Sequence, residues 1–301
     1  MQHPRMALRI ATIGRNGQVA RALAAAADGQ SGITLEQAPS SEADLRDHAS
    51  LSRFIDRSAP DVLINAGAYT FVDRAETEGE AAFAINEAGP RFLAETCARR
   101  GIPFVHMSTD CVFDGTKAEP YAEEDTPNPL SAYGRSKLAG ERAVAEVNPD
   151  ALTVRVCWVF SGFANNFVSK LISLARDASS LQIVDDQVGP PTFAPDVASA
   201  LLRIAGAMRG APGSLSGLLH LAAPDEMDRA AMARAIMAES RRQGGPFAAI
   251  TGISSTAYAA AAHRPLNARL SGALATQMFA LSWTPWPEAL ERSVAAVLAR
   301  G

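Results

Sequence analysis

Cysteine is scarce in this 301-residue chain, and its three cysteines, Cys97, Cys111 and Cys157, lie far apart with no CxxC pair. An odd number of widely spaced cysteines argues against a disulfide framework and against a structural zinc site. His220 and His263 also lack the HxH or HExxH spacing of metal ligands. We therefore predict three reduced thiols and no metal site.

Positive charge is not in excess either. The chain has 28 basic and 32 acidic residues, and its net charge of −4 gives no general attraction for nucleic acid or anionic lipid. It lacks an apolar run long enough to cross a bilayer, and residues 1–9 lack the apolar segment of a secretion signal. We expect a cytoplasmic protein that binds neither nucleic acid nor membrane.

The composition that remains is typical of a globular protein with a full core, with 48 % apolar and 20 % charged residues. In the first half, short apolar runs alternate with helical patterns, which predicts a doubly wound parallel sheet of the Rossmann-like α/β class. The expected strands are 8–13, 33–35, 61–65, 103–107 and 152–159. The expected helices are 18–27, 78–100 and 132–147.

The second half is less regular, and its helical patterns cover 166–175, 195–208, 229–241 and 287–298. Alanine runs at 24–27 and 259–262 also favour helix. We expect residues 1–160 to form the Rossmann-like domain and 161–301 to form mainly a smaller α+β cap, with about 193–222 returning to the sheet. Ligands should bind at the carboxyl ends of the strands.

A glycine-rich turn follows the first expected strand. Gly14, Gly17 and Ala20 form a GxxGxxA pattern. The first glycine permits a tight turn, the second lets backbone approach a diphosphate at a helix N-terminus, and the alanine permits close packing. Because the pattern follows the first strand of a βαβ series, it predicts dinucleotide binding rather than an ordinary turn. Its other candidate cofactor residues are Asn16, Gln18 and Val19.

The second expected strand should end near Glu36, whose carboxylate could bind the ribose diol of NAD(H). Gln37 and Ser40 could equally accommodate the 2′-phosphate of NADP(H), so both NADPH and NADH stay open as cofactors. Asp44 and Leu45 are candidate adenine contacts, with an exposed acidic loop as the alternative.

Tyr133 and Lys137 form a YxxxK pair on the third expected helix, where residues four apart share one face. An ammonium beside a phenol favours the phenolate, so we expect the pKa of Tyr133 to be lowered towards neutrality. Ser108 and Thr109 follow the strand 103–107, and a hydroxyl there could hold a substrate carbonyl against Tyr133. A glycine turn, a hydroxyl and YxxxK in this order form a specific combination.

With these residues in place, the chain resembles the dTDP-4-dehydrorhamnose reductase family of extended short-chain dehydrogenases/reductases. The resemblance runs nearly end to end, and the blocks that carry it are GRNGQVA at 14–20, NAGAYTFVDRAE at 65–76, IN at 85–86, STDCVFDG at 108–115, YGRSKLAGE at 133–141, RVCWVFSGFANNF at 155–167, DDQVGPPT at 185–192 and HRPLNARL at 263–270. The last three blocks separate the family from its epimerase and dehydratase relatives.

The resemblance implies reduction of the 4-keto group of a nucleotide-linked 6-deoxy sugar, dTDP-4-dehydro-L-rhamnose, to dTDP-L-rhamnose by hydride from NADPH or NADH. It implies that Thr109 is the catalytic hydroxyl, Tyr133 the proton donor and Lys137 its helper. Arg264 would approach the diphosphate from the cap. Further implied cofactor residues are Ala66, Gly67, Tyr69 and Asn86. Further implied substrate residues are Asp110, Val112, Trp158, Asn165 and Asn166.

The chain departs from the family at two places. Cys111 stands where many relatives carry tyrosine, which makes one pocket wall smaller. Some relatives use a magnesium-linked dimer with an acidic residue in the helix after the glycine turn, where this chain has Arg21, Ala22 and Leu23. We therefore predict no such metal, and a homodimer formed without it stays open.

Three other functions also stay open. A sugar-nucleotide dehydratase needs a second carboxylate after its catalytic threonine, whereas here Asp110 is followed by Cys111. An epimerase would retain its NAD and need no net reductant. A non-catalytic regulatory subunit of a methionine adenosyltransferase would have no need of intact Thr109, Tyr133 and Lys137.

Overall fold

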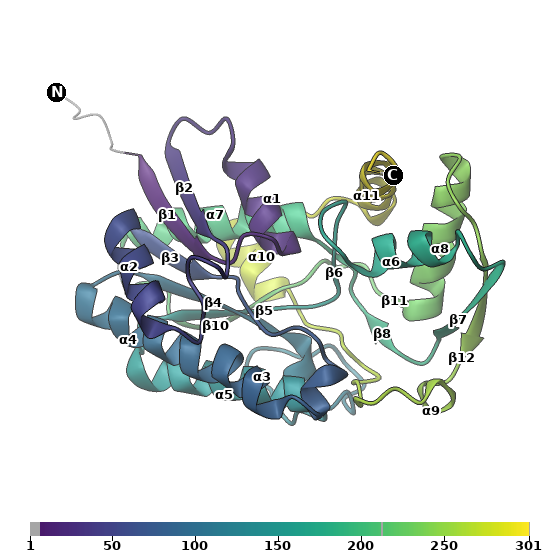
Figure 1. Cartoon of the computed structure of the whole chain (residues 1–301), viewed down its shortest axis with the longest axis horizontal. Coiled ribbons are helices and arrows are strands. Elements are labelled where there is room, and N and C mark those ends of the chain that lie inside the picture. Colours follow the sequence, from purple (N-terminus) through teal and green to yellow (C-terminus); the bar gives the residue numbers. More distant parts are fainter. Residues whose placement is uncertain (1–6, 212, 301) are drawn as a thin grey trace.

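A six-stranded, wholly parallel sheet forms the larger lobe of the computed structural model, which describes residues 7–211 and 213–300 (Figure 1). The strands follow the spatial order β10-β5-β4-β3-β1-β2. Their bounds are β1 Leu8–Ile13, β2 Ile33–Ala38, β3 Val62–Asn65, β4 Phe104–Thr109, β5 Leu152–Val156 and β10 Gly217–Leu221. This arrangement confirms the doubly wound α/β class. The order reverses between β1 and β3, the point at which open α/β sheets bind ligands.

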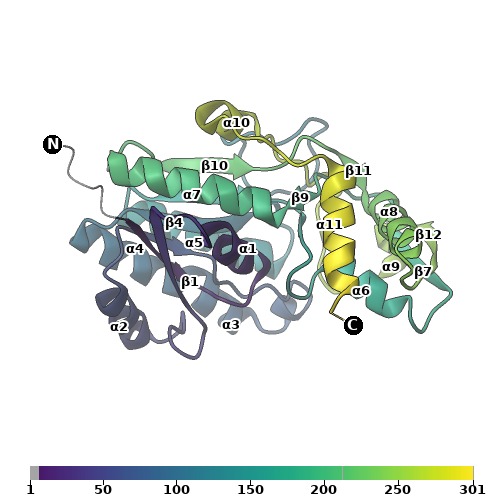
Figure 2. The same ribbon diagram turned by 90° about the horizontal axis from the view of Figure 1, so that it is seen from above.

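Helices cover both faces of the sheet (Figure 2), which is why its strands are almost continuously apolar. One face carries α1, α7 and α10, and the other carries α2, α4 and α5. Their bounds are α1 Gln18–Ala27, α2 His48–Ser58, α4 Gly89–Arg100, α5 Ala132–Val147, α7 Ala194–Gly210 and α10 Ala273–Phe279. The predicted bounds of α1 and α5 are confirmed.

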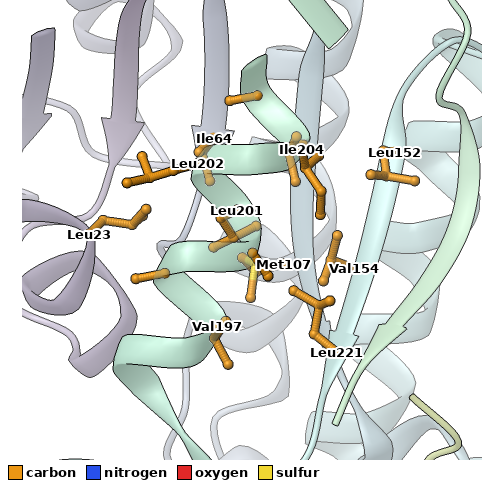
Figure 3. Close-up of a cluster of buried hydrophobic side chains, with 14 of the residues drawn as sticks. Leu23, Ile64, Met107, Leu152, Val154, Val197, Leu201, Leu202, Ile204 and Leu221 are labelled. Atoms are coloured by element: carbon orange, nitrogen blue, oxygen red, sulfur yellow. The ribbon is translucent and has the colours of Figure 1, made fainter. Parts of the chain in front are cut away.

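The long helix α7 returns from the second half of the chain to the sheet. Figure 3 shows its Leu201 and Leu202 packed among side chains of α1 and of the central strands, including Leu23, Ile64 and Met107. Truncating one such buried leucine to alanine costs about 2–5 kcal/mol of stability. The contacts of α7 and the pairing of β10 with β5 attach this late segment to the larger lobe.

The smaller lobe contains helices and short paired strands, which confirms the α+β cap. Its helices are α6 Phe167–Leu174, α8 Arg229–Arg242, α9 Ser255–Tyr258 and α11 Trp286–Leu298. Its paired strands are β7 Ser180–Val184 with β12 Ala249–Ile253, and β8 Val188–Gly189 with β11 Met227–Asp228. The pair β6 Val159–Phe160 and β9 Thr192–Phe193 lies where the chain passes between the lobes. The helices predicted in this half are confirmed within two residues at each end.

Three expected elements differ from the structure. The expected strand 152–159 ends at Val156, and Trp158 adopts a left-handed φ of 41°. The expected helix 78–100 consists of α3 (Gly79–Phe83), a π-helical turn (Ala84–Ala88) and α4. The alanine run 259–262 is not helical, because α9 ends at Tyr258 and Ala259 has a φ of 49°. Tertiary contacts override the weak preference of alanine for helix at this position.

Shorter turns complete the description, with 3₁₀ turns at Arg74–Glu76 and Asp110–Val112. Among the residues described, no helix is long and apolar enough to cross a membrane.

Candidate active site

The glycine turn after β1 packs directly against the chain that leaves β3. Gly14 has a φ of 98°, and a Cβ there would lie 3.1 Å from the Gly67 nitrogen and 3.2 Å from the Ala66 carbonyl carbon. A Cβ at Gly17 would meet nothing within 4 Å, so backbone at the start of α1 is open to close approach. A bare turn at a helix N-terminus fits the diphosphate of a dinucleotide.

The other predicted residues of this turn differ in their availability. Asn16 is exposed, and Val19 packs against the core beneath the sheet. The Gln18 side chain donates to the Val159 carbonyl (3.0 Å) and accepts from the Ser161 hydroxyl (2.9 Å). Gln18 therefore joins the glycine turn to the segment that leads into the cap.

The predicted adenosine side of the site is occupied by ion pairs. Glu36 lies two residues before the end of β2 and pairs with Arg57 at 3.0 Å. Asp44 pairs with Arg46 at 2.7 Å, and Leu45 is buried. Both pairs are partly exposed and therefore weak, so they do not decide between the cofactors, and both NADPH and NADH stay open.

The three predicted catalytic side chains meet at the carboxyl end of β4. The Lys137 ammonium donates to the Met107 carbonyl at 2.7 Å. The Thr109 hydroxyl donates to the Asp110 carboxylate at 2.9 Å, and it lies close enough to the Tyr133 phenol to lower the pKa of that group. Thr109, Tyr133 and Lys137 are only 7 %, 9 % and 2 % exposed, so this centre is nearly closed to solvent.

Burial decides the protonation of this centre. It raises the pKa of Tyr133, and the neighbouring Cys111 and Asp110 raise it further. This shift is opposite to the lowering that we expected from the lysine, because loss of solvation is the largest cause of the shift. Burial also lowers the pKa of Lys137 to about 8, although Glu141 opposes this shift. Tyr133 therefore stays protonated at neutral pH, as a proton donor must.

Asn86, in the π-helical turn, joins the loop after β3 to α5. Its buried amide accepts from the Tyr69 nitrogen (2.9 Å) and donates to the Tyr69 carbonyl (3.1 Å) and to the Ser136 hydroxyl (2.9 Å). The Tyr69 hydroxyl donates to Glu78 at 2.5 Å. These two predicted cofactor residues thus have their side chains bound within the protein, where they position the helix that carries Tyr133.

Two glycines let α5 approach the rest of the lobe closely. A Cβ at Gly134 would lie 2.2 Å from the Cys111 carbonyl oxygen, and one at Gly140 would lie 2.0 Å from the Asn86 carbonyl oxygen. Any larger residue would clash with backbone at either point. The pair therefore lets α5 lie directly against the turn after β4 and against the π-helical turn.

A buried ion pair beneath α5 was not predicted from the sequence. Arg155 of β5 donates twice to Glu141 of α5, at 2.9 and 2.6 Å, and the Ser108 hydroxyl also donates to Glu141. His220 lies 3.5 Å from Arg155, and its pKa is lowered to about 3 by burial and by that arginine. The glutamate falls four residues after Lys137, on the same face of the helix, which is the one signal that could have revealed it.

Two predicted substrate residues have structural roles in the cap and its neighbourhood. Val112 is fully buried in an apolar cluster. Asn166 caps α6, where its side chain accepts from Val168 at 2.9 Å and donates to two backbone carbonyls. Asn165 lines a surface hollow together with Arg176, away from the catalytic side chains.

Arg264 joins the two lobes. Its guanidinium donates to both oxygens of Asp73, at 2.7 and 3.2 Å, and the Ala262 nitrogen donates to the same carboxylate. Asp73 belongs to the loop after β3. Three hydrogen bonds within the protein therefore already engage the guanidinium that was predicted to approach a diphosphate.

Trp158 follows β5, the strand beside β4, and carries an arginine on its ring. The Arg229 guanidinium carbon lies 3.4 Å from the ring centroid. Arg229 was missed in the sequence because a lone arginine at the start of a helix matches no motif.

Within the described residues, no group of three or more His, Cys, Asp or Glu side chains could hold a metal ion.

Comparison with known proteins identifies the family. The family described as "RmlD substrate binding domain" matches residues 8–299. The dTDP-4-dehydrorhamnose reductase of Sinorhizobium fredii is 39 % identical over 295 residues, which cover 98 % of this chain and 99 % of that protein. The chain belongs to the dTDP-4-dehydrorhamnose reductase family.

Solved structures of this family have the same architecture. The dTDP-4-dehydrorhamnose reductase of Clostridium acetobutylicum superimposes with a TM-score of 0.86 at 29 % identity, over 97 % of this chain and 99 % of that one. The reductase of Bacillus anthracis, solved in complex with NADP, gives 0.85 at 25 % identity, over 98 % and 100 %. The family and the fold predicted from the sequence are confirmed.

Proposed function

We propose that this chain is an NAD(P)H-dependent oxidoreductase that reduces the 4-keto group of dTDP-4-dehydro-L-rhamnose to give dTDP-L-rhamnose. The observation that carries the proposal is the meeting of Thr109, Tyr133 and Lys137 at the carboxyl end of β4. The names of the relatives and the NADP bound to one of them support the same activity and cofactor.

In this mechanism, NAD(P)H supplies the hydride when bound. The hydroxyls of Thr109 and Tyr133 bind the keto oxygen and stabilise the negative charge that develops there. Tyr133 then transfers its phenolic proton to that oxygen. Lys137, one helical turn away, stabilises the phenolate that remains.

The two lobes divide the ligands between them in this proposal. Residues 1–160, with about 193–222, bind the cofactor, and the remainder of 161–301 binds mainly the sugar nucleotide. Gly14 and Gly17 receive the cofactor diphosphate, with Ala66 and Gly67 beside them. Asp110 and Trp158 border the sugar site. We expect the reaction to take place in the cytoplasm, where nucleotide sugars and reduced nicotinamides are available. Light scattering will measure whether the chain forms a homodimer.

The state of Cys111 argues against the dehydratase alternative. Elimination of water requires a further acid or base beside the catalytic threonine. Burial raises the pKa of the Cys111 thiol to about 12, so this residue stays neutral and cannot replace the missing carboxylate.

The deciding experiment is a reductase assay on the purified chain. We expect oxidation of NADPH or NADH on addition of dTDP-4-dehydro-L-rhamnose, with a lower rate for its uridine counterpart. Product formation without net cofactor oxidation, with NAD retained during purification, would instead indicate an epimerase. Binding of cofactor without turnover of either sugar would contradict the proposal.

A further inference from the structure

Arg229, the first residue of α8, lies flat on the indole of Trp158. Its guanidinium carbon is 3.4 Å from the ring centroid and 5.1 Å from that of Phe167. The indole also contacts Gly189, where a Cβ would lie 2.6 Å from Cε2 of Trp158. A guanidinium and a backbone segment cannot share one face at these distances. Trp158 is therefore held between the Arg229 guanidinium and the Gly189 backbone.

Local structure fixes this sandwich. Gly189 ends β8 and pairs with Met227 of β11, which brings it next to the start of α8. The Arg229 nitrogen donates to the Gln187 carbonyl at 3.1 Å. Trp158 has a left-handed backbone (φ 41°), and such strained conformations persist where surrounding contacts hold them. The guanidinium is thus oriented before any ligand binds.

The guanidinium of Arg229 lacks an oxygen partner. In residues 7–211 and 213–300, its one hydrogen bond is a 4.0 Å contact to the Met232 sulfur, a weak acceptor. By contrast, Arg155 and Arg264 each donate twice to a carboxylate. Burial lowers the pKa of Arg229 to about 10, which leaves it positively charged at neutral pH. Most of its five N–H donors therefore remain available to a ligand.

This cation lies beside the catalytic centre. Burial raises the pKa values of Asp110 and Cys111, and the Arg229 charge opposes part of each rise. Asp110 directly follows Thr109, whereas Arg229 belongs to the cap. The Arg229 charge thus acts across the boundary between the lobes, on the two residues that follow Thr109.

We propose that Arg229 binds the diphosphate of the nucleotide sugar and so positions the sugar for the groups on β4 and α5. This inference rests on the proposed function. A guanidinium presents parallel donors that match two phosphate oxygens, and stacking on an indole leaves those donors free. Trp158 then serves as a platform for Arg229, while Arg264 is held by Asp73.

The test compares affinities of full-length variants by calorimetric titration with dTDP and, separately, with NADPH. We expect Arg229→Met to weaken dTDP binding about tenfold or more and to leave NADPH binding unchanged. Arg229→Lys keeps the charge but loses the paired donors, so it should retain intermediate affinity. Arg234→Met, at an exposed arginine of the same helix, is the matched control and should bind dTDP like the wild type.

Steady-state kinetics give a second readout. Arg229→Met should raise the KM for the nucleotide sugar about tenfold while kcat changes less than about threefold, because the lost contact is to a non-reacting group. If Arg229→Met loses NADPH binding, it has misfolded, and Arg229→Lys decides instead. Wild-type affinity for dTDP in the folded variant would overturn the role of Arg229.

Failure of the proposed function gives a different result. A wild-type chain that binds dTDP without reducing the 4-keto sugar would overturn the reductase proposal alone, and the Arg229 variants would still decide the role of the arginine. A wild-type chain that binds neither dTDP nor UDP would overturn both.

Discussion

The two sides of the catalytic centre differ in how their charged residues are neutralised. On the sheet side, Arg155 and Glu141 are buried and joined by two hydrogen bonds. On the cap side, Arg229 lies on Trp158 without an oxygen partner among the described residues. A buried charge needs a partner to be tolerated, so a partner missing from the protein is one that a ligand can supply. In our proposal, the sheet side therefore holds the reacting groups, and the cap side recognises the diphosphate of the substrate.

Tyr133→Phe should have the largest effect and should separate chemistry from recognition. Loss of the proton donor lowers kcat by about 10²–10⁴-fold. Affinity for dTDP and NADPH should hold, because only one hydroxyl is removed. Stopped-flow and steady-state measurements of NADPH oxidation check this prediction. The control is Tyr258→Phe, which changes an exposed tyrosine of the cap. A kcat within a factor of about three of wild type would remove Tyr133 from the mechanism.

Glu141→Gln should destabilise the protein, because it leaves the buried Arg155 without a counter-ion. Unpairing such a charge costs about 3–5 kcal/mol of unfolding free energy, measurable by urea denaturation. The matched control is Glu95→Gln, which breaks an exposed pair with Arg91 (3.2 Å) and should cost less than about 1 kcal/mol. Equal losses of unfolding free energy in the two variants would show that the buried pair contributes no more to stability than the exposed pair.

The pH profile should identify Lys137 as the group that titrates on the sheet side. Its pKa is lowered by burial from 10.5 to about 8, so kcat/KM should fall as pH rises through about 8. Stability should change in the opposite direction. Between about pH 8 and 10.5 the unfolded lysine keeps a proton that the folded one has released, so unfolding free energy rises with pH. A flat kinetic profile across this window would exclude a role for the Lys137 charge.

Asp73→Asn should have the smallest effect, because the pair with Arg264 is partly exposed. We expect a loss of less than about 1 kcal/mol of unfolding free energy, shrinking further at high salt. Parallel denaturation of variant and wild type at two salt concentrations checks this. A loss of several kcal/mol would mean that this pair holds the lobes together as a buried one does.

Structural features that are set by residues close together in the sequence could be predicted from it. The glycine turn and the bounds of α1 and α5 are of this kind, since turns, caps and helical periodicity are local. The strands β7 and β12 were missed because each is short and pairs with a partner about 70 residues away. The alanine run 259–262 was misjudged because propensity is a weak signal.

In the candidate site, too, local features could be predicted from the sequence and long-range contacts could not. Spacing placed Tyr133 and Lys137 on one helical face, but it could not give the degree of burial that raises the pKa of the tyrosine. Resemblance named Arg264 and Asn166, but it could not show that their donors are already committed to Asp73 and to backbone carbonyls. Arg229 became visible only when packing brought it against Trp158.

The position of Tyr133, the proposed proton donor, depends on the absence of side chains at two positions of its helix. Because Gly134 and Gly140 carry only hydrogens, α5 packs directly against two backbone carbonyl oxygens. A single methyl group at either position would clash with the facing carbonyl oxygen, so α5, and Tyr133 with it, or the facing turn would have to shift. Substitutions there would behave as active-site mutations although neither residue presents a side chain to any ligand, and a redesign of this scaffold should leave both untouched.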